Sequence, residues 1–153
     1  MLNATQVWHR LKTLKAFKSM TESDFRPIVY GQTFTPAAGG AATASQAVLF
    51  PGGAIILGIT ASGFVPTAAI GGQSAANRQV FGIDFSFSNN EAIVVSGPLS
   101  ADALLGGGDN TIFPLRELII APNQQIGTRV ANYTTGALTV HVCFHCLIYR
   151  FAS

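Results

Sequence analysis

Residues 79–95, with the sequence QVFGIDFSFSNNEAIVV, decide the fold class of this chain. From residue 79 to residue 89, apolar side chains alternate with small or polar ones, which is the period of a β-strand with one buried face. The side chains expected to face the core are Phe81, Ile83, Phe85 and Phe87. Asn89-Asn90 then supplies a turn and the apolar run at residues 92–95 returns, so the segment predicts a β-hairpin.

Similar short runs of β-branched and aromatic residues recur along the rest of the chain. They lie at residues 27–34, 47–50, 54–60, 117–121, 125–132 and 137–151. Gly, Pro, Asn and Ser separate these runs, as expected for turns, and no helical period appears after residue 26. About eight strands joined in this way predict an all-β fold, an antiparallel β-sandwich or jelly roll.

Three segments between the predicted strands are expected to be loops, at residues 37–45, 63–77 and 96–114. The first two consist almost entirely of small, uncharged residues. Loops in water usually carry charged or flexible polar side chains, so these two are expected to become ordered only against other subunits. Limited proteolysis of the isolated subunit tests this hypothesis, because loops that resist cleavage in a monomer would contradict it.

The chain carries few charges. Only 10% of its 153 residues are Asp, Glu, Lys or Arg, whereas an ordinary soluble domain has about 25%. Residues 27–77 contain none at all. Exposed charge keeps isolated proteins dispersed, so this chain is expected either to lie in a membrane or to cover its exterior with other protein.

A membrane span is not expected. A spanning helix needs about 20 mostly apolar residues, but Pro51-Gly52-Gly53 interrupts the best candidate, residues 47–59. The N-terminus also lacks the apolar core of an export signal. Cys143 and Cys146 lie three apart on one predicted strand and so point to opposite faces. They cannot easily bridge each other, which fits a protein made in the cytosol.

The first 26 residues differ from the rest. They carry five basic and two acidic side chains, whereas residues 27–153 are close to neutral. Apolar residues also recur there at helical spacing. The division predicts a basic amphipathic arm at residues 1–26 and a β-sandwich domain at 27–153. The candidate interaction residues of the arm are Val7, Trp8, Leu11, Lys12, Leu14, Lys15, Phe17 and Lys18.

Three interpretations of the arm remain open. It is a helix folded onto its own domain, an anchor that lays its apolar face into a groove of a neighbouring subunit, or a contact to nucleic acid or anionic lipid. The third is the least favoured, because no recognised nucleic-acid-binding motif accompanies the basic residues. Neither a nucleic-acid partner nor a membrane partner is therefore expected.

Motifs of catalysis are missing from the sequence. It contains no GxSxG, no HExxH, no P-loop and no second CxxC beside the single one at residues 143–146, so no enzyme, no cofactor and no small-molecule substrate are expected. Asn132-Tyr133-Thr134 matches the glycosylation pattern, but without an export signal we interpret the match as coincidental.

One cluster, at residues 141–146 (HVCFHC), carries residue types that bind zinc. His141, Cys143 and His145 are expected to project from one face of a strand. The outer two would lie about 13 Å apart, too far for a single ion to bind all three. Packing within a sheet or a subunit interface is therefore favoured over a metal shared across a symmetry axis, and no metal site is predicted.

About the last 35 residues, at 117–132 and 137–151, resemble small jelly-roll virion proteins of tailed bacteriophages. The similarity lies in a strand, a loop with a proline, a V-x-N strand at Val130-Ala131-Asn132, and a long last strand that closes on Tyr149-Arg150. His and Cys stand here where aliphatic or polar residues would be expected. The resemblance implies a capsid-decorating or cement protein, often a trimer, or a component of a neck or tail junction.

We therefore expect a non-enzymatic viral structural protein that acts as a capsid decoration or cement subunit. Its partners would be the major capsid protein or other virion subunits, it would be a homo-trimer, and its contacts would be apolar and hydrogen-bonded. It would be assembled in the host cytoplasm and located in the virion. The alternatives are a neck or tail component and a carbohydrate-binding β-sandwich at a spike or fibre.

Overall fold

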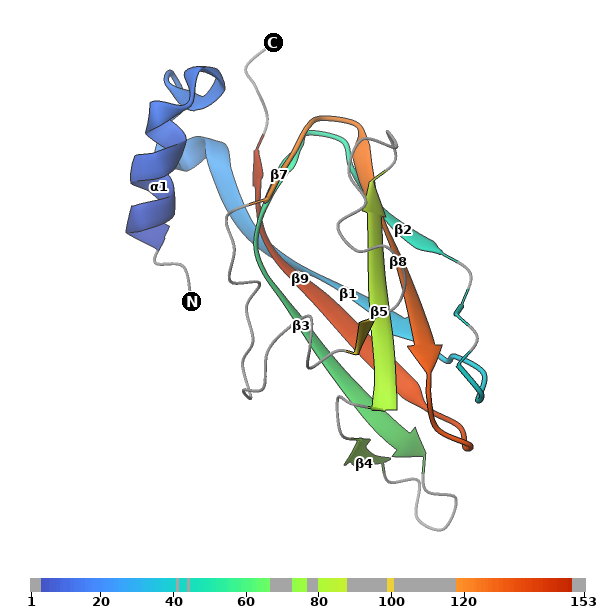
Figure 1. Cartoon of the computed structure of the whole chain (residues 1–153). Coiled ribbons are helices and arrows are strands. Elements are labelled where there is room, and N and C mark those ends of the chain that lie inside the picture. Colours follow the sequence, from blue (N-terminus) through green and yellow to red (C-terminus); the bar gives the residue numbers. More distant parts are fainter. Residues whose placement is uncertain are drawn as a thin grey trace.

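The computed structural model describes residues 4–40, 42–43, 45–66, 73–76, 80–87, 99–100 and 118–149. These residues form two antiparallel sheets with a short helix at one end (Figure 1). The first sheet contains β1 (Phe25–Phe34), β3 (Ala54–Pro66), β4 (Gln73–Ala76), β7 (Leu118–Ile120) and β9 (Thr139–Tyr149). The second contains β2 (Gln46–Phe50), β5 (Phe81–Phe87), β6 (Leu99–Ser100) and β8 (Gln124–Asn132). The predicted all-β class is confirmed.

All strand pairs are antiparallel, and β9 is central in the first sheet. There the order is β1-β9-β3, and both β7 and β4 pair with the far side of β3. β7 pairs with Ala54–Ile56 and β4 with Gly63–Pro66, so the two follow one another along the same edge. The order in the second sheet is β2-β8-β5-β6. Seven of these strands have four or more residues, while β6 and β7 are shorter.

The core lies between the two sheets. Phe81, Ile83 and Phe85 of β5 are buried there, as their alternation predicts, and the Phe85 ring meets Phe144 of β9 edge-on at 5.8 Å. Along β9, buried and half-buried residues alternate over most of the strand. Nothing is described of the Phe87 side chain.

The predicted strands correspond closely to the observed ones. β1, β2, β3, β5, β7, β8 and β9 each overlap a predicted run. β1 begins at Phe25 rather than at residue 27, and β9 begins at Thr139 rather than at residue 137, while residues 150–151 of the predicted run lie outside the described residues. The returning strand of the hairpin, at residues 92–95, lies outside the described residues. So does most of the segment at 96–114, within which Leu99–Ser100 forms β6 instead of a loop.

The segment at residues 63–77, predicted as a loop, is partly strand. β3 continues through Pro66 and pairs with β4 at Gln73–Ala76. Small residues give no clear apolar alternation, which is why the sequence pattern missed these strands. Their backbone groups nevertheless need partners, and the free edge of β3 supplies them.

The described part of the segment at residues 37–45 runs alongside β8 and the turn after it. Gly39 and Gly40 have φ of 89° and 85°, values that favour glycine. Their N–H groups donate to the Thr134 and Asn132 carbonyls at 3.2 and 2.7 Å. The described part of this segment is therefore hydrogen-bonded within the subunit.

The N-terminal segment is helical only at its start. α1 spans Ala4–Thr13, and two single 3-10 turns follow, η1 (Lys15–Phe17) and η2 (Glu22–Asp24). The predicted helical period thus ends before Leu14, and η1 carries Phe17. Among the described residues, no helix has the length and apolar character that crossing a bilayer would require.

Candidate interaction surfaces

The apolar side of the N-terminal segment contacts this chain's own sheet. Val7, Leu11 and Phe17 are at most 2% exposed. They form a second hydrophobic cluster with Ile55 of β3 and Tyr149 of β9, on the outer face of the first sheet. Of the three interpretations of the arm, the structure has the helix folded onto its own domain.

The cationic side of the segment is partly engaged as well. The Lys12 ammonium lies over the Trp8 ring, 4.7 Å from its centroid, and donates to the Met20 carbonyl. The Trp8 ring in turn meets Phe25 edge-on at 5.4 Å. Lys12 therefore links α1 to the segment around Met20 that leads into β1.

Three of the predicted arm residues stay accessible. Leu14 is 39% exposed, and Lys15 and Lys18 are exposed beside it. They are the most exposed members of the predicted set, and Trp8 and Lys12 are half-buried.

A short capping box joins the arm to β1. The Thr21 N–H and hydroxyl both donate to one carboxylate oxygen of Asp24, at 2.7 and 3.0 Å. These two hydrogen bonds, the backbone one foremost, lower the pKa of Asp24 below its ordinary value. Asp24, together with Arg26, also lines a hollow of about 290 Å³ over the end of β9. The Asp24 carboxylate oxygen that accepts both hydrogen bonds from Thr21 therefore stabilises the turn.

Much of the described remainder of this outer face is exposed or half-buried, and we call it the open face. It consists of outward residues of β1, β3 and β9: Val29, Gly31, Thr33, Thr60, Ser62, His141, Cys143 and His145. All are exposed or half-buried, and Val29 is 57% exposed. None of the eight is Asp, Glu, Lys or Arg, so the open face can contact a partner without burying an ionised carboxylate, ammonium or guanidinium group.

Polar contacts order the open face. His141 shares a hydrogen bond of 3.0 Å with the Thr33 hydroxyl, and His145 one of 3.1 Å with the Thr60 hydroxyl. The Phe64 ring packs edge-on against His141 at 5.5 Å. Each imidazole is therefore held by a neighbouring strand, and its other ring nitrogen remains for a partner or water.

The predicted His and Cys cluster shares one face of β9, as the alternation indicates. His141, Cys143 and His145 are half-buried on the open face, while Cys146 lies in the core on the other side of the strand. Burial raises the pKa of the Cys146 thiol to about 12. Both cysteines are unpaired. In the described part of the chain, no three His, Cys, Asp or Glu residues are arranged to hold a metal ion.

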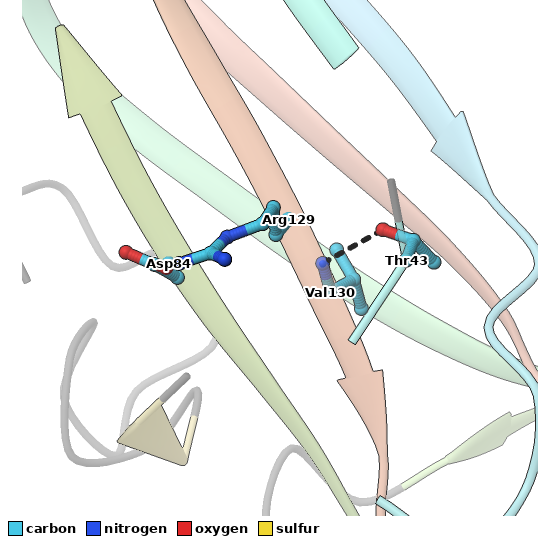
Figure 2. A network of polar contacts seen from close by, with 4 residues as sticks. All are labelled: Thr43, Asp84, Arg129 and Val130. Atoms are coloured by element: carbon cyan, nitrogen blue, oxygen red, sulfur yellow. Dashed lines mark hydrogen bonds and ion pairs between the residues drawn. The ribbon is translucent and has the colours of Figure 1, made fainter. Parts of the chain in front are cut away.

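The second sheet carries an ion pair that the sequence pattern did not predict. Asp84 of β5 and Arg129 of β8 are register partners and form a salt bridge. Figure 2 shows them side by side, with the Val130 N–H donating to the Thr43 hydroxyl at 3.1 Å. Asp84 is 2% exposed and Arg129 46%. The only signal in the sequence was an Asp and an Arg within otherwise uncharged strands, and their pairing across 45 positions was not readable from it.

The second carboxylate oxygen of Asp84 has no hydrogen-bond partner among the described residues. A buried, unmatched acceptor is costly, and the contact of the other oxygen to Arg129 offsets part of the cost of burying this carboxylate. Because the guanidinium reaches solvent, the pair neutralises a carboxylate without creating an exposed anionic site.

Asn132 is the most fully hydrogen-bonded polar side chain of the described region. Its amide nitrogen donates to the Gly136 carbonyl at 2.8 Å and to the Pro36 carbonyl at 3.4 Å. Its oxygen accepts from the Thr134 N–H and hydroxyl at 2.9 and 2.7 Å. Asn132 has no exposed surface, so the match to a glycosylation pattern is explained by a structural turn.

Comparison of this chain with protein-family models, with curated proteins and with solved structures gave no match.

Proposed function

We propose that this chain is a non-enzymatic structural subunit of a virion, and that it decorates or cements the capsid. The observation that carries the proposal is the strand order. With β4 set aside, the described residues form eight strands, ordered β1-β9-β3-β7 and β2-β8-β5-β6. This is the order of a jelly roll, a fold of eight strands in two Greek keys that recurs in viral capsid domains.

The open face supports an architectural role. A stable contact buries roughly 800 Å² on each partner, and interface centres are poor in charge. The open face offers Val29 with hydroxyl, thiol and imidazole groups around it, and no carboxylate, ammonium or guanidinium. A capsid surface could therefore cover the open face without removing a carboxylate, ammonium or guanidinium group of that face from water. We propose the major capsid protein or another virion subunit as that partner.

The arm has a more limited part in this proposal than the sequence predicted. Its apolar side is covered within the subunit, so Leu14, Lys15 and Lys18 remain as its most exposed contacts to a neighbour. The trimer implied by the resemblance stays a prediction.

A purified virion tests the proposal directly. Quantitative mass spectrometry should find the chain in particles freed of cell debris, and an antibody against it should label the outside of intact capsids. Many copies spread over the shell fit a decoration subunit, whereas a few copies at one vertex fit the neck or tail alternative. A chain that stays in the cell lysate and never enters particles contradicts the proposal.

A carbohydrate-binding β-sandwich at a spike or fibre is the second candidate, because one aromatic side chain is exposed. Tyr133, in the connection from β8 to β9, is 46% exposed, and Gly40 lies against its ring. Sugars stack on exposed rings of this kind. The neighbouring residues 134–136 are Thr, Thr and Gly and offer no carboxylate, which makes this candidate the weaker one. Glycan-array binding that Tyr133→Ala abolishes would establish it instead.

A further inference from the structure

β1 forms an edge of the first sheet, and one contact fixes the direction of its backbone groups. The Tyr149 N–H donates to the Gly53 carbonyl at 3.2 Å, on the β3 side of β9. Odd-numbered residues of β9 therefore direct N–H and C=O toward β3, and even-numbered ones toward β1. By the register of β1 and β9, odd-numbered residues of β1 then point to the free edge.

Two features of β1 agree with this assignment. The Thr33 carbonyl accepts a hydrogen bond of 3.3 Å from the Gln46 side chain, which lies beyond the edge. Pro27 has no N–H and loses nothing at an outward position. The edge is therefore closed at both ends, by Pro27 and by Gln46, and open between them.

The open stretch is Val29–Gly31. The N–H and C=O groups of Val29 and Gly31 point outward, and no partner for them occurs in the described part of the chain. The Val29 side chain is 57% exposed. Unpaired edges of this kind are templates for strand addition, and proteins usually guard them with charge, proline or a bulge. Residues 27–34 of β1 contain no Asp, Glu, Lys or Arg that would hinder strand addition.

Gly31 has no evident purpose inside the subunit. Its φ is not positive, and a Cβ added there would meet only the Cys143 sulfur, at an ordinary 3.8 Å. Glycine in the interior of a strand weakens it, and often marks a place where another backbone approaches closely. Gly31 thus stands in the stretch of β1 whose outward backbone groups are unpaired, at a position where another backbone could approach closely.

We propose that β1 pairs with β1 of a second copy of this chain, antiparallel, about a two-fold axis at Tyr30. Val29 of each copy then faces Gly31 of the other, and each such pair exchanges two N–H···O=C bonds. The absent side chain of Gly31 leaves room for the Val29 isopropyl group. The two open faces become one continuous surface that contains no Asp, Glu, Lys or Arg.

The register is set by Pro27. In this pairing Pro27, which has no donor, lies opposite Thr33, whose carbonyl already accepts from Gln46. A shift by one pair in one direction places Pro27 opposite Gly31, so the Gly31 carbonyl meets no N–H donor. A shift in the other direction places Val29 opposite Thr33, so the Val29 N–H meets a carbonyl that already accepts from Gln46. Because the same short stretch supplies both complementary halves, a second copy fits it better than an unrelated strand. The proposal stands on the edge of β1 alone and does not depend on the proposed role in a virion, and its closed two-fold pair differs from the homo-trimer that the resemblance implies.

Analytical ultracentrifugation of the full chain tests the pairing. At about 100 µM the wild type should sediment as a dimer. With a Kd of about 1 µM, nearly all of the chains would be in the dimer at this concentration. Val29→Lys should raise that Kd at least about tenfold, because two lysines then flank the axis. Leu49→Lys makes the same change at another exposed edge-strand residue, 52% exposed on β2, and should leave the Kd unchanged.

A second variant keeps the test decisive if Val29→Lys fails to fold. Gly31→Thr suits the strand and has room in the subunit, but fills the space reserved for Val29 of the second copy, so it should also raise the Kd. Hydrogen exchange supplies the register, because the amides of Val29 and Gly31 should be protected only in the wild-type dimer. A monomeric wild type, an assembly that neither variant weakens, equal effects of Val29→Lys and Leu49→Lys, or fast exchange at both amides would overturn the proposal.

Discussion

At the scale of single residues, Asn132 decides how β8 connects to β9. Its side chain holds the Thr134 N–H and the Gly136 carbonyl while it is itself buried. Asparagine is suited to this task because one short side chain carries both donors and acceptors. The chain therefore turns here through side-chain hydrogen bonds and not through an apolar contact.

Replacing Asn132 with Ala should lower the free energy of unfolding by about 2–4 kcal/mol, because buried backbone groups lose their partners. Urea denaturation followed by circular dichroism measures this change. Thr135→Ala is the matched control, since Thr135 is exposed in the same turn, and should change stability by less than about 0.5 kcal/mol. Equal effects of the two substitutions would show that Asn132 does not hold the turn.

The two cysteines should differ sharply in reactivity. Thiol reagents attack the thiolate, and burial raises the pKa of Cys146 to about 12, so at pH 8 its thiol stays protonated and covered. Cys143 is half-buried on the open face. Mass spectrometry after brief alkylation of the native protein should find label on Cys143 before Cys146, and both should react in denaturant. Preferential native labelling of Cys146 would place it outside the core.

At the scale of elements, the turn between β2 and β3 depends on a close approach. Gly53 has a φ of 91° and lies against the Tyr149 ring, where an added Cβ would meet ring carbon at 2.6 Å. The Tyr149 hydroxyl donates to the Ile120 carbonyl of β7 at 2.9 Å. A turn, the last strand and β7 are thus joined at one residue.

Gly53→Ala should destabilise the fold by about 2–4 kcal/mol, because it adds both backbone strain and a steric overlap. Gly136→Ala is the control, since a Cβ there meets nothing within 4 Å, and it should leave stability unchanged or raise it by about 0.5–1 kcal/mol. The difference between the two urea midpoints measures the effect. A Gly53→Ala protein as stable as wild type would mean that Tyr149 is free to move away.

The N-terminal segment should contribute to stability as part of the domain. Leu11 is fully buried against the first sheet, whereas Leu14 is 39% exposed. Leu11→Ala should therefore lower the free energy of unfolding by about 2–5 kcal/mol, and Leu14→Ala by less than about 1 kcal/mol. Thermal or urea unfolding compares them. Similar small effects for both would indicate an arm that leaves its own sheet in solution.

The strands were predictable where an apolar period of two was strong. Phe81, Ile83 and Phe85 illustrate this, since all three are buried in the core, although Gly82 and Asp84 between them are buried as well and the expected exposed face is missing there. β4, with the sequence QSAA, has no such period and forms because β3 offers it a free edge. Sequence patterns record burial of side chains, whereas β4 rests on backbone pairing.

The candidate site was predictable only in part, for a related reason. The placement of His141, Cys143 and His145 on one face follows from a single strand. The ion pair of Asp84 and Arg129 joins positions far apart in the chain, and no local pattern indicates it. The amphipathic period of the arm marked its apolar side but carried no information about which surface covers it.

At the scale of the whole molecule, charge is distributed in a way that separates two kinds of contact. The basic residues cluster in the N-terminal segment, whereas the open face has none of the four charged residue types. Contacts through the open face should then be apolar and hydrogen-bonded. Salt screens exposed ion pairs strongly but leaves such contacts largely intact.

The most direct measurement is therefore the number of these chains bound per purified virion in about 0.1 M and about 1 M sodium chloride at neutral pH, where the Debye length falls from about 10 Å to about 3 Å. Quantitative mass spectrometry of pelleted particles supplies the count. The uncharged contact surface predicts the same number of bound chains in both salts. Release of most copies in the higher salt would contradict it and assign the binding to the basic arm instead.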